Sequence, residues 1–314
     1  MLDRTRVTVV GAGNVGSNTA RRIAEKDLAD EVVMVDIVEG LPQGLALDIN
    51  QSAPIEGFEA HVIGTNDYAD TAGSQVVVIT AGLPRQPGMS RMDLLDKNAA
   101  IVASVTEEIV VHSPDCIIIV VSNPLDEMTF LASTVSGFPK ERVMGMAGVL
   151  DSARLRYFIA EKLGVAPSAV EAITLGSHGD QMVALPRHAT VEGKPLPELV
   201  DESTLEELFR RTRDAGAEIV GYLKKGSAFY APSSSAVAMV RSILTDANDV
   251  LPTCAWTTGQ YGVSDVYLGV PARLGRTGVT EVVELDLNDD ELAQLQEAAA
   301  AIRIKCDELA ARRG

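Results

Sequence analysis

Two short valine-rich runs, joined by a glycine-rich turn and a helical pattern, constrain the fold of this chain more than any other segment. The runs are Arg6–Val10 and Val32–Val35. The turn between them is Gly11–Ala12–Gly13–Asn14–Val15–Gly16. Gly11 permits a tight turn, Gly13 lets the backbone approach a pyrophosphate, and Gly16 permits close packing of helix on strand. The N-terminus of the helix adds free N–H groups and a positive dipole end, both of which favour an anion.

An acidic residue at the end of the second run extends this pattern. Asp36 lies twenty residues after Gly16, where its carboxylate can accept a hydrogen bond from a ribose 2′-hydroxyl. Its charge would repel a 2′-phosphate, so the pattern favours NAD over NADP. A tight turn that binds nothing is the alternative for the glycines alone. The order of strand, turn, helix, strand and acid favours dinucleotide binding.

The same alternation of apolar runs and helical patterns continues to about residue 147. Near-continuous Val/Ile runs are expected in a parallel sheet that is covered on both faces, hence a doubly wound α/β fold. Further strands are expected over 61–64, 75–81, 116–122 and 142–146, and helices over 41–51, 94–112 and 127–133. We therefore expect a doubly wound parallel dinucleotide-binding sheet in a domain over residues 1–147.

The pattern changes in the second half of the chain. Helices are expected over 151–163, 203–224, 233–244 and 289–312, with short strands around 170–191 and a strand meander over 253–285. Helices mixed with short antiparallel strands indicate an α+β domain. We expect this second, catalytic domain to cover residues 148–314. The segment Ala228–Pro232 flanks a helix and could wall a pocket, but the sequence assigns it no contact.

Composition excludes several classes of function. A formal net charge of −17 argues against nucleic acids and anionic membranes as partners, because the long-range field repels both. Three widely spaced cysteines form neither a disulfide framework nor a metal site, and the first residues show no secretory signal. These features predict a cytoplasmic protein without a bound metal. The acidic excess suits either a high-salt interior, as in a halophile, or an ordinary acidic cytosolic enzyme.

Polar side chains follow the expected strands at the edge where ligands bind in parallel sheets. Arg85 and Arg91 lie six residues apart in a glycine- and proline-broken segment after the strand that ends near residue 81. Two cations there could hold a small anion with more than one negative group. The Ser122–Asn123–Pro124 segment ends another strand. The Asn123 amide could face the same ligand, or Asn123 could be only a turn residue before proline.

Acid–base chemistry near neutral pH has few candidates, because the chain has four histidines. His178 lies between glycines in Gly176–Ser177–His178–Gly179–Asp180, an exposed setting typical of a working side chain. Asp151 and Arg154 lie three residues apart on an expected helix and therefore share a face. They could form an intrahelical ion pair, or they could orient an imidazole and bind a carboxylate. Spacing alone does not decide between these possibilities.

Taken together and in order, these motifs resemble the lactate/malate dehydrogenase family. The resemblance rests on the glycine turn, Asp36, Arg85 and Arg91, Ser122–Asn123–Pro124, Leu150–Asp151–Ser152–Ala153–Arg154 and the segment around His178. It covers nearly the whole chain, and it is closest to the malate dehydrogenases of the lactate-dehydrogenase-like group. It implies reversible hydride transfer between NAD and a 2-hydroxy acid, with (S)-malate and oxaloacetate as the substrate pair.

The resemblance also implies a role for each site residue. His178 would exchange the proton with the substrate hydroxyl, Asp151 would hold His178, and Arg154 would bind the C1 carboxylate. Arg91 would polarise the reacting carbonyl from a mobile loop, and Asn123 would bind substrate near the nicotinamide. The residues expected to contact the cofactor are Gly11, Ala12, Gly13, Asn14, Val15, Gly16, Asp36, Asn98, Val121, Ser122 and Asn123.

The choice of substrate depends on Arg85. In the family's pattern, lactate enzymes carry glutamine at this position and malate enzymes carry arginine, which suits the second carboxylate of oxaloacetate. A lactate or broader 2-hydroxyacid dehydrogenase is one alternative, and a dinucleotide sensor without turnover is another. The complete acid–base set argues against the sensor. The resemblance further implies a homo-oligomer, with a homotetramer expected and a homodimer as the alternative.

Overall fold

The computed structural model describes residues 4–83, 91–179 and 181–313, and its contacts divide the chain into two compact units. The first unit comprises Met1–Met146, Phe229–Asp249 and Arg273–Thr280, and the second comprises Ala147–Ala228, Val250–Ala272 and Glu281–Gly314. Two later segments therefore join the first unit, so the compact units are not continuous in sequence. The functional division at residue 147 stays a prediction.

A parallel sheet forms the centre of the first unit. Its strands are β1 (Arg6–Val10), β2 (Glu31–Val35), β3 (His61–Thr65), β4 (Val76–Ile79), β5 (Ile117–Val120) and β6 (Val143–Gly145). They are hydrogen-bonded in the order β3-β2-β1-β4-β5-β6, and each adjacent pair is parallel. The strand order reverses between β1 and β4, which is where ligands bind in doubly wound sheets. The predicted fold class is confirmed.

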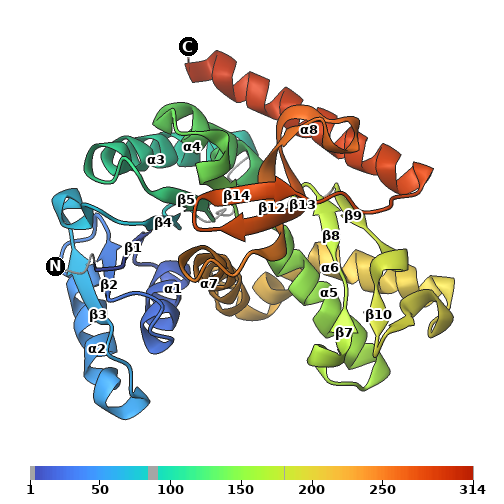
Figure 1. Ribbon diagram of the computed structural model, residues 1–314, viewed down its shortest axis with the longest axis horizontal. Coiled ribbons are helices and arrows are strands. Elements are labelled where there is room, and N and C mark those ends of the chain that lie inside the picture. Colours follow the sequence, from blue (N-terminus) through green and yellow to red (C-terminus); the bar gives the residue numbers. More distant parts are fainter. Residues whose placement is uncertain (1–3, 84–90, 180, 314) are drawn as a thin grey trace. The chain divides into compact units, whose positions relative to one another are not determined.

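Helices cover both faces of this sheet. They are α1 (Asn14–Glu25), α2 (Leu41–Glu56), α3 (Arg91–His112), α4 (Leu125–Ser136) and α7 (Tyr230–Leu244), with short 3-10 turns at Tyr68–Thr71 and Lys140–Arg142. Figure 1 shows α3 and α4 on one face and α1 and α7 on the other. Every residue of β4 and β5 is buried as a result. This explains why these strands are unbroken runs of valine and isoleucine.

Several boundaries differ from the sequence expectation, although each predicted element exists. Helix α2 continues to Glu56, beyond the expected end at residue 51, because it passes through Pro54 and stops only at Gly57 with φ +85°. Helix α7 begins at Tyr230 rather than at residue 233, so most of the segment expected to flank it forms its first turn. Strands β4 and β5 are each shorter than expected at both ends.

Besides α7, the described second half of the chain contains further helices and strands of varied length. The helices are α5 (Gly148–Leu163), α6 (Glu202–Leu223) and α8 (Asp289–Arg313). The strands are β7 (Val170–Glu171), β8 (Thr174–Gly176), β9 (Met182–Ala184), β10 (Thr190–Val191), β11 (Lys194–Pro195), β12 (Asp249–Thr258), β13 (Ser264–Gly275) and β14 (Gly278–Val282). Short 3-10 turns lie at Pro167–Ala169, Pro186–His188, Leu196–Glu198 and Gln260–Gly262. Pairing is antiparallel in β11-β10-β7 and from β13 through β8 to β9, as expected for the α+β half.

An apolar core holds α5 against α6 within the second unit. Leu155, Phe158 and Ile159 of α5 pack in one buried cluster with Leu208 and Phe209 of α6. Burying a side chain of this size stabilises a fold by about 1.5–3 kcal/mol. This packing fixes the distance between α5 and α6. The polar side chains that α5 carries are therefore also held at a fixed distance from α6.

None of the helices within residues 4–83, 91–179 and 181–313 is both long and apolar enough to cross a bilayer.

Candidate active site

The glycine turn after β1 takes a conformation that requires glycine at two positions. Gly11 has φ +99°, and a Cβ there would lie 2.9 Å from the Thr80 Oγ1 and the Ala81 nitrogen. A Cβ at Gly16 would lie 1.7 Å from the Gly11 carbonyl oxygen. No side chain fits at either point. The turn is therefore built by the close approach of α1 to β1, as the sequence pattern predicts.

The third glycine of the motif faces open space. Gly13 is the N-cap of α1, and a Cβ there would meet no atom of the described residues within 4 Å. No side chain of the described residues caps this helix end. The N–H groups of the first turn are therefore left for a ligand, and the helix dipole favours an anionic one. This arrangement fits the pyrophosphate of a dinucleotide.

Asp36 is held against this turn by two backbone hydrogen bonds. Its Oδ2 accepts from the Ala12 nitrogen at 2.6 Å, and its Oδ1 accepts from the Val38 nitrogen at 2.9 Å. An ionised carboxylate has about four acceptor positions, so it can still accept from a ribose hydroxyl. The side chain is thus fixed beside the glycine turn with acceptor capacity to spare.

Thr80 braces the same turn from the neighbouring strand, and the sequence analysis did not single it out. Its Oγ1 lies 2.9 Å from the Val10 carbonyl oxygen and 3.1 Å from the Gly11 carbonyl oxygen, so its one O–H is shared between the two acceptors. It follows β4 directly, at the same edge of the sheet as Gly11. The place of Thr80 at the end of a strand was a signal in the sequence, since functional residues often follow the strands at this edge of the sheet. Its hydrogen-bond partners could not be read from the sequence, because they depend on how β1 pairs with β4.

Asn98 and Ser122 link the segments that follow β4 and β5. Asn98 is 1% exposed; its Oδ1 accepts from the Leu83 nitrogen at 2.8 Å, and its Nδ2 donates to the Asn123 carbonyl at 2.6 Å. Ser122 donates to the Ala81 carbonyl at 2.6 Å. Asn123 itself is exposed. The Asn98 amide and the Ser122 hydroxyl therefore hold the backbone of neighbouring segments in place. Direct contact with a cofactor stays a prediction for these two residues and for the buried Val121.

A buried carboxylate, that of Asp151, contacts two other candidate site residues of the second unit. Asp151 lies in the first turn of α5, and its side chain is 3% exposed. Its Oδ2 lies 2.7 Å from the His178 Nδ1, and its Oδ1 accepts from the Arg154 Nη1 at 3.3 Å. Because an ionised carboxylate only accepts, His178 donates through Nδ1. The structure thus brings together the three residues that the sequence placed in two separate motifs.

The backbone around His178 depends on its flanking glycines. Gly176 ends β8 with φ +84°, and Gly179 has φ +150°. The Ser177 nitrogen donates to the Gln181 carbonyl at 3.3 Å, which closes the turn. The His178 side chain is 18% exposed, so the ring is fixed by Asp151 and still reaches solvent. Asp180, the last residue of the motif, lies outside the described residues.

The two arginines expected after β4 are described only in part. Arg85 lies outside the described residues. Arg91 is the first residue of α3. The remaining histidines do not join the cluster: His61 begins β3, His112 lies 3.8 Å from Glu108, and the His188 Nε2 lies 2.9 Å from the Asp286 carbonyl.

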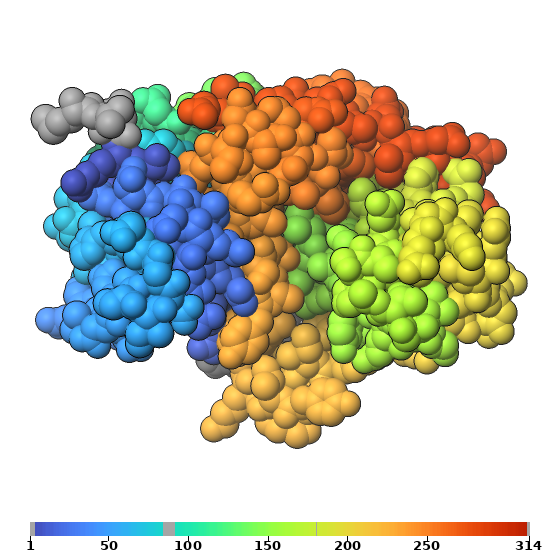
Figure 2. Space-filling model, turned by 60° about the horizontal axis from the view of Figure 1, so that its bottom comes forward, coloured from blue at the N-terminus to red at the C-terminus, as the bar shows by residue number. Residues whose placement is uncertain are grey.

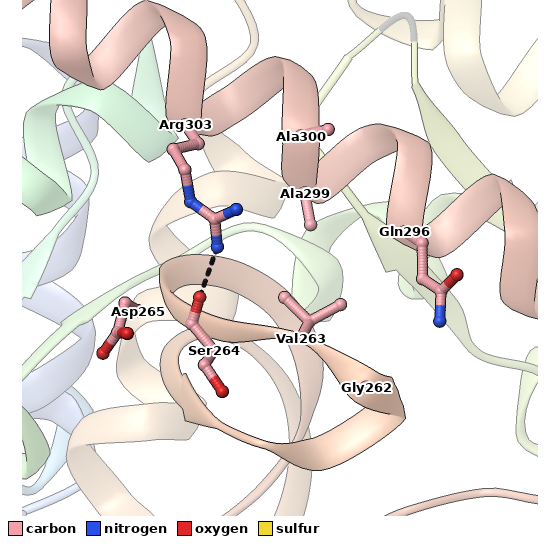
Figure 3. Close-up of a pocket in the computed structure, with 8 residues that line it drawn as sticks. All are labelled: Gly262, Val263, Ser264, Asp265, Gln296, Ala299, Ala300 and Arg303. Carbon is pink, nitrogen blue, oxygen red and sulfur yellow. Dashed lines mark hydrogen bonds between the residues drawn. The ribbon is translucent and has the colours of Figure 1, made fainter.

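A pocket beside α8 and the buried Cys116 lie apart from the candidate site. A pocket of about 530 Å³ lies beside α8 and is shown in Figure 3, where Arg303 donates to the Ser264 carbonyl. It contains none of the predicted site residues. Burial raises the pKa of the Cys116 thiol to about 12, which makes it a poor nucleophile. Within the described ranges, no group of three His, Cys, Asp or Glu side chains is placed to hold a metal ion.

Comparison with known proteins decides what kind of site this is. Residues 5–145 match the family model of the lactate/malate dehydrogenase NAD binding domain, and residues 148–312 match that of the lactate/malate dehydrogenase alpha/beta C-terminal domain. The chain belongs to the lactate/malate dehydrogenase family. The resemblance inferred from the motifs is thereby confirmed, and so is the assignment of NAD to the first domain.

Three relatives show how far the similarity extends. A malate dehydrogenase from Chloroherpeton thalassium is 53% identical, with 97% of this chain and 98% of that protein covered. The solved malate dehydrogenase from Salinibacter ruber is 51% identical with a TM-score of 0.94, covering 98% of this chain and 99% of that one. A Cryptosporidium parvum lactate dehydrogenase, solved with lactic acid and NAD, is 42% identical with the same TM-score of 0.94 and the same coverage. Within the family, the fold alone therefore does not select the substrate.

The brace made by Thr80 gives a prediction for cofactor binding. Thr80→Val keeps the shape but removes the hydroxyl that holds the Val10 and Gly11 carbonyls, so we expect NADH to bind about tenfold more weakly. Thr80→Ser keeps the donor and should bind within about twofold of the parent. Fluorescence titration of NADH measures both.

A buried threonine away from the turn provides the control. Thr106 is 0% exposed and donates to the Val102 carbonyl within α3, so Thr106→Val removes a comparable hydrogen bond. It should change the melting temperature without changing NADH binding. Equal binding by Thr80→Val and the parent would show that the brace has no role in forming the turn.

Proposed function

We propose that this chain is an NAD-dependent malate dehydrogenase that interconverts (S)-malate and oxaloacetate. The proposal agrees with the names of its curated relatives, which are malate dehydrogenases at 52–56% identity over at least 95% of this chain. The observation that carries it is the buried Asp151 carboxylate between the His178 imidazole and the Arg154 guanidinium. A site that only senses a dinucleotide needs no such acid–base set.

In the proposed mechanism, His178 moves the proton. Its Nδ1–H is committed to Asp151, which fixes the neutral tautomer and leaves Nε2 as the base for the malate hydroxyl. When Nε2 takes the proton, the adjacent carboxylate stabilises the imidazolium. NAD, when bound, supplies the acceptor for the hydride from the substrate carbon. In the reverse direction His178 returns the proton to the carbonyl oxygen of oxaloacetate.

The arginines hold and polarise the substrate. Arg154 binds the C1 carboxylate, which suits a guanidinium that is 14% exposed and has one nitrogen on Asp151. Arg91 acts on the reacting carbonyl, and Asn123 binds substrate near the nicotinamide. Arg85 pairs with the second carboxylate, since burying that charge without a partner would be costly. The roles of Arg85 and Arg91 rest on the family pattern.

The cofactor contacts follow the glycine turn. The open space at Gly13 and the uncapped start of α1 suit a pyrophosphate. Asp36 suits a ribose with a free 2′-hydroxyl, which favours NAD over NADP. We expect Ala12, Asn14, Val15 and Gly16 to line the same turn. Asn98, Val121 and Ser122 remain proposed contacts.

A direct assay tests the proposed function and the role of His178 together. NADH oxidation is followed with oxaloacetate, pyruvate and 2-oxoglutarate, and each acid is also tested with NADPH. We expect oxaloacetate with NADH to be the best pair. His178→Asn should keep NADH binding and lose turnover by about 10²–10⁴-fold, the usual contribution of a general acid–base group. A variant that still turns over at the parent rate would refute proton transfer by His178.

The role of Arg85 in substrate choice is tested separately. Arg85→Gln removes the charge that pairs with the second carboxylate, so kcat/KM for oxaloacetate should fall roughly 100-fold while that for pyruvate rises. Arg210→Gln is the control, because Arg210 is 68% exposed and pairs only with Asp214 on its own helix among the described residues. If Arg85→Gln leaves the ratio of kcat/KM for oxaloacetate to that for pyruvate unchanged, the role assigned to Arg85 is wrong.

A homotetramer, with a homodimer as the alternative, completes the proposal. Leu47, Gln51 and Ile55 lie four residues apart on one face of α2, and Leu47 and Ile55 are 59% and 85% exposed. The light-blue surface in Figure 2 belongs to this part of the first unit. Exposed apolar side chains on one face suit an interface between subunits. Light scattering should give more than one chain per particle, and Leu47→Glu should lower that mass. A cytoplasmic location and the two explanations of the acidic excess stay predictions.

A further inference from the structure

Ser152 ties the helix that carries Asp151 to the strand that leads to His178. It follows Asp151 directly in α5 and is 6% exposed. Its Oγ accepts from the Thr174 nitrogen at 3.0 Å and lies 3.3 Å from the Thr174 Oγ1. Thr174 is the first residue of β8 and is 1% exposed. A buried N–H group needs an acceptor, so this hydrogen bond fixes how β8 lies along α5.

Helix α5 and strand β8 pack closely at this point (Figure 1). A Cβ at Gly148, the first residue of α5, would lie 3.2 Å from the Thr174 carbonyl oxygen. Strand β8 also pairs with β13, where Gly176 lies opposite Gly269. A Cβ at Gly269 would lie 2.2 Å from the Gly176 carbonyl oxygen. The start of β8 is therefore packed closely against α5, and its end is packed closely against β13.

The position of His178 depends on β8, because the segment around the histidine is rich in glycine. Strand β8 has three residues and ends at Gly176, two residues before His178. Gly176 has φ +84° and Gly179 has φ +150°. Glycine has more backbone freedom than any other residue, so these two positions do little to fix the imidazole. The place of β8 therefore helps to determine where the imidazole meets the Asp151 carboxylate.

A shift of β8 along α5 would change proton transfer and leave substrate binding intact. Asp151 and Arg154 both lie on α5, so they keep their places relative to each other. His178 follows β8 instead. Its Nδ1 lies 2.7 Å from the Asp151 Oδ2, and a small shift of the strand would lengthen this distance. A displacement of about 1 Å at a reacting group can lower a rate about 100-fold.

We propose that Ser152 is a positioning residue that keeps the His178 imidazole in register with the Asp151 carboxylate. It contacts neither substrate nor cofactor and acts through His178. The inference rests on the proposed function, because it takes His178 as the group that moves the proton. Loss of the Ser152 hydroxyl lowers the rate of the chemical step. Binding of oxaloacetate by Arg154 and binding of NADH are retained.

A serine in the first unit supplies a matched control. Ser242 of α7 is 0% exposed, and its Oγ accepts from the nitrogen of Asp249, the first residue of β12, at 3.2 Å. The same link between a helix serine and the first N–H of a strand is thus present away from the proposed acid–base residues. Ser152→Ala and Ser242→Ala remove the same kind of acceptor. Both should lower the melting temperature by about 2–10 °C.

The expected result is a loss of kcat in the Ser152 variant and not in the control. With oxaloacetate and NADH, Ser152→Ala should lose kcat by about 10–100-fold and keep KM and NADH affinity within about threefold. Ser242→Ala should keep kcat within about twofold. Thr174→Val removes the hydroxyl but leaves the backbone N–H, so its kcat should fall by about 3–10-fold. If Ser152→Ala does not fold, the same comparison of kcat with KM in Thr174→Val decides.

A double variant tests whether Ser152 acts through His178. Without the imidazole there is no proton-transfer group to position. Adding Ser152→Ala to His178→Asn should therefore change the residual kcat by no more than about twofold. Independent effects would multiply instead. A further loss of about tenfold in the double variant would overturn the inference, since the serine would then affect the rate by another route.

Failure of this inference differs from failure of the proposed function. If the parent turns over oxaloacetate and Ser152→Ala keeps the parent kcat, the inference is overturned and the proposed function stands. Equal losses of kcat in Ser152→Ala and Ser242→Ala would also overturn it, because both losses would then reflect lower stability. A parent without turnover of oxaloacetate would overturn the proposed function, and the inference with it.

Discussion

The buried carboxylate of Asp151 makes the interactions on which the proposed chemistry of this chain depends. A charge that is 3% exposed is stable only when hydrogen-bonded and paired. Here the pairing groups are the His178 imidazole, which we propose moves the proton, and the Arg154 guanidinium, which we propose binds the substrate. One buried group therefore fixes both proposed functional side chains. Removing such a partner costs about 3–5 kcal/mol, so the arrangement couples the fold of this unit to its activity.

In the first unit, the parallel pairing of the strands brings the proposed functional residues together. Because all six strands run in the same direction, the residues that follow them meet at one edge of the sheet. Gly11 follows β1, Asp36 follows β2 and Thr80 follows β4. Asp36 accepts from the Ala12 nitrogen and Thr80 donates to the Gly11 carbonyl, and these hydrogen bonds hold the glycine turn in shape. The shape of the expected cofactor site thus depends on the common direction of the strands as much as on the glycines.

Much of this could be predicted from sequence, because the signals are local. Unbroken valine and isoleucine runs gave the parallel sheet, and the glycine spacing gave the turn. The spacing of Asp151 and Arg154 left an ion pair and a functional pair both open. The structure shows why: Arg154 uses Nη1 for the ion pair and leaves Nε without a partner among the described residues. In the proposed site one side chain serves both purposes, which no spacing rule distinguishes.

Thr80 could not be found this way, because its role depends on a contact between segments far apart in sequence. It acts across the pair of β1 and β4, where its hydroxyl lies within hydrogen-bond distance of the Val10 and Gly11 carbonyl oxygens. A threonine at the end of a valine-rich run reads from sequence only as a strand residue. Its meaning appears when the neighbouring strand brings the glycine turn against it. A polar side chain at the end of one parallel strand then helps to shape the turn that follows the next strand.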